Sequence, residues 1–190
     1  MTQSVTAAES PEPVRETVRF PTFSPEEFKA AFRHHPGGVG LITAVGPDGP
    51  VAMTATSVAS VSAEPALLVF SVSEISSSAP ALKAAETVVV HMLRAADLPL
   101  ARLGATSGID RFADTTLWHS LTTGEPVFHG TRWLRCRIVN RFEAGTATLV
   151  VAQPIQSNLA TDESDAAETG DGLVYENRTW HRIGEHSRTD

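Results

Sequence analysis

Cysteine is almost missing from this sequence, and so are apolar runs long enough to cross a membrane. The single cysteine, Cys136, excludes an internal disulfide and a metal site built from several thiolates, and it is typical of a small side chain on a buried strand. A membrane-spanning helix needs about 20 consecutive apolar residues. The first 19 residues carry three glutamates in place of the basic and apolar regions of a signal peptide. We therefore expect a cytoplasmic protein without a membrane partner.

Basic residues are also in short supply, since 15 Lys and Arg stand against 22 Asp and Glu and give a net charge of −7. Residues 161–172 contain five acidic residues and no basic one, so most of the negative charge is local. We interpret this stretch as a solvated acidic loop. The lack of a basic face argues against a nucleic-acid partner.

The length of 190 residues and an apolar content of 42% predict one folded domain with its own core. Residues 1–22 hold three prolines and no sustained apolar period, which is typical of a flexible arm. We place the domain at residues 23–184 and a short tail at 185–190.

Short runs rich in β-branched residues dominate the domain, separated by turn residues. Ser24, Pro25 and Glu27 form the pattern that starts a capped helix, which we expect to end at Pro36. The expected strands are 39–45, 51–61, 67–72, 87–93, 133–142, 146–155 and 173–180, with short helices at 79–86 and 98–103 and irregular chain at 105–123. Strands adjacent in sequence and joined by tight turns favour an antiparallel barrel over a doubly wound parallel sheet.

Conventional catalytic motifs are not found. The seven histidines include no HExxH pair, so no metal site is predicted. A GxSxG elbow, a GxxxxGK loop and a GxGxxG turn after a strand are also missing, which disfavours a typical hydrolase, a P-loop protein and a Rossmann dehydrogenase.

Two local features have a functional and a plain structural interpretation. Residues 53–62 are small and rich in hydroxyls, which suits either a strand lying against a flat ligand or an exposed strand face. The run from Ser76 to Ser78 opens an expected helix, where it would hold an anion such as a phosphate or simply cap the helix.

Several ordered blocks of this sequence closely resemble the flavin reductase family. They are residues 33–43, 53–65, 110–112, 124–130 and 173–175, and the similarity extends over about residues 24–182. The resemblance implies a mainly β protein, an FMN-binding split β-barrel that is antiparallel and Greek-key-like with a few short helices. It also implies a homodimeric NAD(P)H:flavin oxidoreductase that reduces FMN or FAD for a partner monooxygenase of a two-component system.

The resemblance also assigns roles to residues. The second strand would border the isoalloxazine, Ser77 and Ser78 would reach the ribityl chain and phosphate, Arg111 would neutralise the phosphate, and Phe112 would cover a cofactor face. The implied flavin contacts are Pro50, Val51, Ala52, Met53, Thr54, Thr56, Ser57, Ser71, Val72, Ser73, Ser77, Ser78, Arg111 and Phe112. The implied NAD(P)H contacts are Tyr175, Glu176, Asn177 and Arg178.

One position departs from the family pattern. Many members carry a histidine where this sequence has Ala147, and His181 is the candidate to take its catalytic part. The departure keeps a non-catalytic flavin-binding or storage protein open as the alternative function. A relative of the pyridoxamine-phosphate-oxidase-like barrels that uses another flavin or a deazaflavin is a third interpretation.

Overall fold

The computed structural model describes residues 22–159 and 170–189. They divide into two compact units at Phe32. The predicted arm, except for residue 22, and residues 161–169 of the predicted acidic loop lie outside the described residues. Within the described ranges, no helix combines the length and apolar character needed to cross a membrane.

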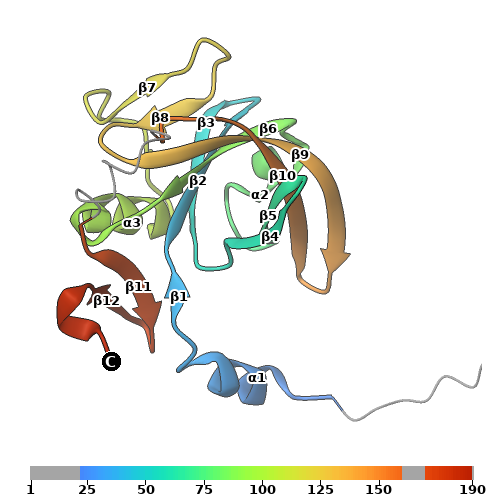
Figure 1. Cartoon of the computed structure of the whole chain (residues 1–190). Helices are drawn as coiled ribbons and strands as arrows, with labels where there is room; N and C mark the ends of the chain where they lie inside the picture. Colours follow the sequence, from blue (N-terminus) through green and yellow to red (C-terminus); the bar gives the residue numbers. More distant parts are fainter. Residues whose placement is uncertain (1–21, 160–169, 190) are drawn as a thin grey trace, which may run out of the picture. The chain divides into compact units, whose positions relative to one another are not determined.

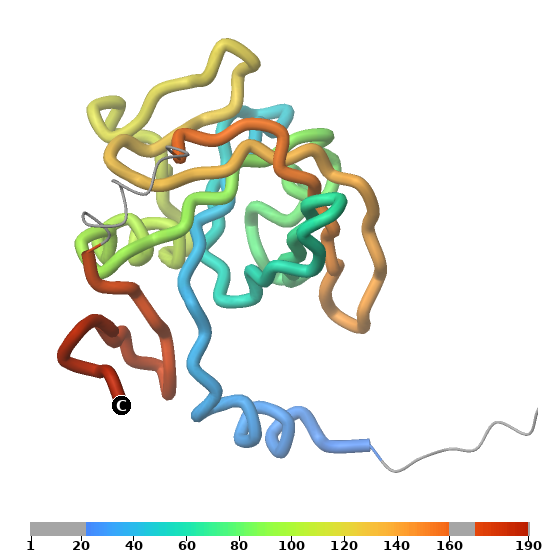
Figure 2. Tube along the Cα trace, viewed as in Figure 1, coloured from blue at the N-terminus to red at the C-terminus, as the bar shows by residue number. Residues whose placement is uncertain are grey.

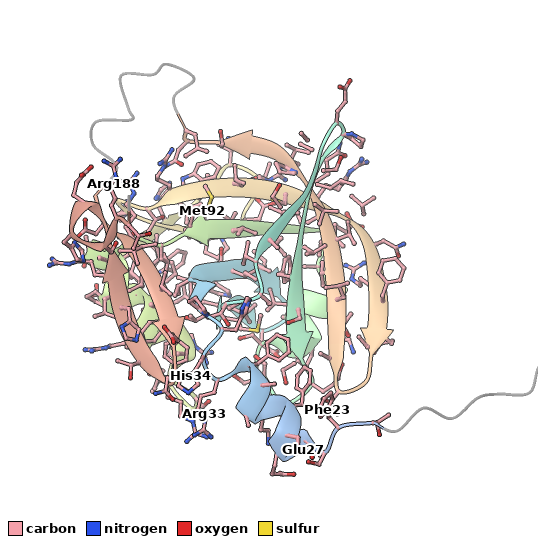
Figure 3. The ribbon with its side chains drawn as sticks, turned by 60° about the horizontal axis from the view of Figure 1, so that its bottom comes forward. Phe23, Glu27, Arg33, His34, Met92 and Arg188 are labelled. Carbon is pink, nitrogen blue, oxygen red and sulfur yellow. The ribbon has the colours of Figure 1, made fainter. Side chains whose placement is uncertain are left out.

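The first unit contains helix α1 (Pro25–Phe32), which begins with the predicted capping box. The backbone N–H of Ser24 donates to the Glu27 carboxylate (2.8 Å), and Ser24 Oγ accepts the N–H of Glu27 (3.2 Å). These hydrogen bonds hold the pKa of Glu27 below its ordinary value. Figure 3 labels Glu27 on this helix.

The second unit, from residue 33 onward, is mostly β-structure (Figure 1). Its strands are β1 (Gly37–Gly38), β2 (Gly40–Gly46), β3 (Gly49–Ala55), β4 (Ala59–Ala63), β5 (Ala66–Ser73), β6 (Thr87–Met92), β7 (Trp118–Ser120), β8 (Pro126–Phe128), β9 (Arg132–Ala144), β10 (Ala147–Ser157), β11 (Gly172–Glu176) and β12 (Thr179–Ile183). Its helices are α2 (Ala79–Ala84), α3 (Leu98–Ala105), and the 3₁₀ helices η1 (Ala95–Asp97) and η3 (Glu185–Ser187).

Seven strands form one antiparallel sheet in the order β3-β2-β6-β9-β10-β5-β4. The two edge strands, β3 and β4, are consecutive in sequence and joined by residues 56–58 alone. A flat sheet would separate them by about 29 Å, whereas this link spans roughly 14 Å at most. The sheet must therefore curl, as the trace in Figure 2 shows. The mainly β, antiparallel fold predicted from the sequence is confirmed.

The curled sheet is packed on both faces. One core contains alternate residues of β5, namely Leu68, Phe70 and Val72, and is closed by Leu82 of α2. A second core lies on the opposite face of β2, around Leu41, where α3, β8 and β11 cover the sheet. Burial on both faces explains why β2 is a run of apolar residues with little alternation.

Two expected strands are divided in the structure. The run 51–61 is interrupted at residues 56–58, where the chain passes from one sheet edge to the other. The run 173–180 is a hairpin of β11 and β12, because Asn177 (φ 46°) and Arg178 (φ 61°) form a two-residue turn in the left-handed region that hairpins favour. The expected irregular stretch 105–123 contains the short strand β7, which pairs with β8.

Candidate functional site

A polar pocket of about 450 Å³ opens where three segments distant in sequence meet. The segments are the β2–β3 turn with the start of β3, the start of α2, and the loop after α3. The lining consists of Gly46, Pro47, Asp48, Gly49, Pro50, Val51, Ala52, Ser77, Ser78, Pro80, Ala81, Ala84, Ile109, Asp110, Arg111 and Phe112. The volume lies in the range of about 300–1,000 Å³ that is usual for small-molecule sites.

Helix α2 sits tightly against the β2–β3 hairpin. The buried Ser78 hydroxyl donates to the carbonyl oxygen of Ala52 (2.8 Å), which ties the start of the helix to β3. Gly46 permits the approach, since a Cβ there would lie 2.7 Å from Cβ of Ala81. Ser77 is exposed at the pocket, so its hydroxyl is available to a ligand.

Arg111 supplies the most distinctive group of the polar pocket. One guanidinium nitrogen, Nη2, donates to the carbonyl of Thr106 (2.6 Å). Its Nε is buried and has no hydrogen-bond partner in the described part of the chain. Burial lowers the pKa of Arg111 from its ordinary value, although a guanidinium remains charged at neutral pH. A buried N–H without a partner is costly unless an acceptor reaches it, and an oxyanion is the strongest such acceptor.

Seven of the predicted flavin contacts line this pocket: Pro50, Val51, Ala52, Ser77, Ser78, Arg111 and Phe112. The remaining seven lie elsewhere. Met53 and Val72 are buried in the core, and the Thr54 hydroxyl donates to Ala101 of α3 (2.8 Å).

Four hydroxyl residues complete the predicted flavin set. Ser57 Oγ accepts the backbone N–H of Ser71 (2.9 Å) and so joins the β3–β4 link to β5. Thr56 and Ser73 are exposed, at the β3–β4 link and at the end of β5. The structure therefore gathers half of the predicted set at one pocket, and flavin contacts by all fourteen residues stay a prediction.

The predicted NAD(P)H residues lie in the β11–β12 hairpin. Tyr175 packs against Trp180 with ring centroids 4.6 Å apart. Glu176 lies 3.7 Å from the imidazole of His34, which Figure 3 labels beside the hairpin. Asn177 donates its N–H to the carbonyl of Arg33 (2.8 Å). None of the four predicted residues lines the polar pocket.

Ala147, which stands where many family members have a histidine, and His181, the candidate to replace that histidine, both lie on strands. Ala147 begins β10 beside Ser73 of β5. His181 is exposed on β12 and pairs with Val174. Neither is part of the polar pocket lining, so a catalytic role for His181 stays a prediction.

A second pocket of about 510 Å³ is largely apolar and was not foreseen from the sequence. It is lined by parts of β4, including Ser60 and Ser62, by parts of β5 and β11, and by Met92 at the end of β6, which Figure 3 labels. Its residues are distributed over many strands, so no local pattern marks it. In the polar pocket, sequence reasoning missed Asp48 and Ile109, although the Gly46–Gly49 turn itself was evident from its glycines and proline.

Metal-ligating groups do not gather in the described ranges, where no cluster of three or more His, Cys, Asp or Glu side chains could hold an ion. His119 and His129 stack with centroids 4.8 Å apart as an isolated pair. Cys136 is buried, and burial raises the pKa of its thiol to about 12, so it is not a nucleophile.

The fold and the polar pocket define a class of protein, an antiparallel sheet protein with a pocket of small-molecule size that Arg111 lines. Comparison with known proteins identifies the family. The model of the flavin reductase like domain matches residues 32–184. The chain belongs to this family, as the sequence predicted.

Two curated relatives and one solved structure illustrate the similarity. The NADH:FMN oxidoreductase of Rhodococcus qingshengii is 42% identical over 157 residues, which cover 82% of this chain and 80% of the relative. The reductase component of 4-hydroxyphenylacetate 3-monooxygenase from Pseudomonas aeruginosa is 31% identical, covering 83% and 91%. The Streptomyces globisporus NADH:FAD oxidoreductase SgcE6, solved with NAD and FAD fragments, is 26% identical with a TM-score of 0.74, covering 89% and 100%.

Proposed function

We propose that this protein is an NADH:FMN oxidoreductase that reduces free flavin and releases it for a separate monooxygenase. The observation that carries the proposal is the convergence of three distant segments, each predicted to contact flavin, on one pocket lined by Arg111, whose Nε has no partner in the described part of the chain. The family supports the reductase activity.

The residues of the polar pocket fit FMN. The Arg111 Nε, which has no partner among the described residues, and the exposed Ser77 hydroxyl would donate to the phosphate. The backbone of Pro50, Val51 and Ala52 would border the ring system. Phe112, which is 5% exposed, forms an apolar wall.

The reaction requires little acid or base chemistry from the chain. Bound flavin supplies the redox chemistry by accepting a hydride from the nicotinamide. The chain's part is to hold two flat rings in contact, to offer donors to the flavin edge and to anchor the phosphate. This role agrees with a pocket lining of one arginine, two serines, two aspartates and otherwise Gly, Pro, Ala, Val, Ile and Phe, which contains no Ser-His-Asp triad.

FMN and NADH are preferred over FAD and NADPH in the proposal because the 42% identical relative is an NADH:FMN oxidoreductase. A partner monooxygenase is proposed because another relative is the reductase component of one. The homodimer and the cytoplasmic location stay predictions. Exposed Val139 and Phe142 on β9 favour the homodimer, since a second copy would cover them.

The competing function is flavin binding without turnover, which Ala147 in place of the family histidine favours. Steady-state oxidation of NADH and NADPH, each crossed with FMN, FAD and riboflavin, separates the two. We expect repeated turnover, with the highest kcat/KM for NADH and FMN. Tight flavin binding without nucleotide oxidation would replace the reductase proposal by the storage function.

A further inference from the structure

We propose that Trp118 is a positioning residue for the flavin phosphate, because it fixes the loop that directs Arg111 into the polar pocket. The inference rests on the proposed function and assigns a role to a residue that does not itself line the pocket.

The loop that carries Arg111 has little regular structure to hold it. Residues 106–117 lie between α3 and β7 and belong to no helix or strand. Phe112, the neighbour of Arg111, is instead held by side chains at both backbone groups. Its N–H donates to Asp110 Oδ1 (2.9 Å), and its carbonyl accepts the indole Nε1–H of Trp118 (3.0 Å).

The rings of Trp118 and Phe112 add a second constraint. They meet edge to face, with centroids 5.1 Å apart and an interplanar angle of 83°, an arrangement that aromatic pairs favour. Phe112 also packs against Phe128 at 5.4 Å. The hydrogen bond and the ring contact come from the same indole, so one side chain fixes both the backbone and the side chain of Phe112.

Trp118 can act as an anchor because β7 is itself tied to the main sheet. Trp118 on β7 pairs with Phe128 of β8. Strand β8 is joined to β2 by the Thr43 hydroxyl, which donates to the carbonyl of Pro126 (2.6 Å), and to β6 by His91, whose Nε2 accepts the N–H of Phe128 (3.2 Å). A continuous series of buried and partly buried contacts thus extends from the sheet through Trp118 to the loop that carries Arg111.

Loss of the indole N–H should release the Phe112 carbonyl and let the loop move, while the pocket walls on β3 and α2 remain. The guanidinium would then no longer be held toward the phosphate. Binding of the flavin ring, which depends on the other segments, should change little. The affected quantity is phosphate preference, defined as the Kd of riboflavin divided by the Kd of FMN.

The test measures phosphate preference by quenching of flavin fluorescence in four variants of the full chain. They are Trp118→Phe, Arg111→Gln, the double variant, and Trp133→Phe as a matched control in another cluster. We expect Arg111→Gln to lower the preference at least tenfold, since a charged hydrogen bond is lost. Trp118→Phe should lower it about three- to tenfold with a nearly unchanged Kd for riboflavin, and should add little to Arg111→Gln.

Three results are distinguishable. A wild-type preference near one would overturn the phosphate site and the positioning role together, whereas the reductase activity itself is tested separately by nucleotide oxidation. A strong preference that Arg111→Gln removes but Trp118→Phe leaves intact would refute the positioning role alone. The positioning role would also be refuted if the fold-loss of phosphate preference in the double variant equalled the product of the two single fold-losses. Trp118 would then act independently of Arg111.

A second pair of variants keeps the inference testable if Trp118→Phe folds poorly. Asp110→Asn retains an oxygen that can accept the N–H of Phe112, whereas Asp110→Ala does not, and both remove the same charge. We expect a lower phosphate preference for Asp110→Ala than for Asp110→Asn. Equal preferences would contradict the view that tethering of Phe112 positions Arg111.

Discussion

His91 shows how a single buried side chain can join two layers of the structure. It is fully buried on β6. Its Nδ1 lies 3.0 Å from the carbonyl of Leu41, and its Nε2 accepts the N–H of Phe128. A neutral ring protonated at Nδ1 satisfies both contacts. Burial lowers the pKa of His91 to about 4, although the bond to Leu41 opposes the shift.

The lowered pKa predicts a stability that declines on acidification. Above about pH 6.5 His91 is neutral in both folded and unfolded chains and contributes no pH dependence. Between 6.5 and about 4 only the unfolded chain binds the proton, so the free energy of unfolding should fall by about 1.4 kcal/mol per pH unit at most. Urea unfolding at several pH values measures this slope.

The control for this prediction is His91→Gln, which cannot titrate. It should be less stable than the wild type at pH 7 but should lack the slope between pH 6.5 and 4.5. Glu74 and Glu125, whose pKa values lie below the ordinary 4.5, contribute stability that is lost only at lower pH. An unchanged slope in His91→Gln would show that His91 is not the responsible group.

At the scale of single residues, the sequence predicted which residues belong to the site better than it predicted their contacts. Arg111 was singled out by its place in a family-like block and Ser78 by the serine run that opens a helix, and both line the polar pocket. The burial of Arg111 Nε depends on the loop after α3, for which no periodic pattern exists. Thr54 was predicted to serve a ligand, yet its hydroxyl bonds to Ala101, because α3 packs on β3 in a way that no local signal shows.

At the scale of elements, the contact between α3 and β3 depends on Gly104. A Cβ at this position would clash with the Leu41 side chain and the Thr54 hydroxyl, and would lie 3.2 Å from the Thr54 backbone nitrogen. The helix can therefore approach the strand only without a side chain here. The contact is close enough for Thr54 to reach the Ala101 carbonyl.

Gly104→Ala should push α3 away from the sheet. We expect a loss of about 1–3 kcal/mol from overpacking, even though alanine favours helices. The corresponding decrease in Tm is on the order of 5 °C for a protein of this size, and calorimetry measures it. Gly38→Ala is the matched control, since a Cβ at Gly38 meets no atom within 4 Å. An equally stable Gly104→Ala variant would contradict the packing described.

The strand pattern was largely predictable, and its interruptions were not. β-Branched and apolar runs marked β2, β5, β6, β9 and β10 within a few residues of their bounds. The predictions of one strand at 51–61 and one at 173–180 were wrong, because each run contains a break that the sequence does not mark. Neither interruption contains glycine or proline, since residues 56–58 are Thr, Ser and Val and the β11–β12 turn uses Asn177 and Arg178.

At the scale of the whole sheet, curling creates the polar pocket. The hairpin turn after β2, the start of α2 and the loop after α3 are separated by about 30 residues each in sequence, yet they meet at one site. The interior core that α2 closes fixes the position of Ser77 and Ser78 relative to β3. Such long-range proximity follows from strand order, which sequence periodicity does not determine, and the family resemblance implied only the split-barrel fold as a whole.

The buried Glu125 stabilises the attachment of β8 to the main sheet. Its carboxylate accepts hydrogen bonds from Thr87 and Thr123 and pairs with Arg135 Nε (2.8 Å). Burial raises the pKa of Glu125, but the hydroxyl and guanidinium hydrogen bonds outweigh it and leave the pKa below the ordinary value. The carboxylate therefore stays charged at neutral pH and links β8 to β6 and β9.

The central claim, that the polar pocket holds the phosphate end of FMN, is tested most directly by a crystal structure of the protein with FMN. We predict a phosphate oxygen within hydrogen-bond distance of Arg111 Nε and the isoalloxazine beside the backbone of Pro50, Val51 and Ala52. Ordered FMN in the apolar pocket lined by Met92 and Leu173, with Arg111 Nε still unpartnered, would contradict the claim.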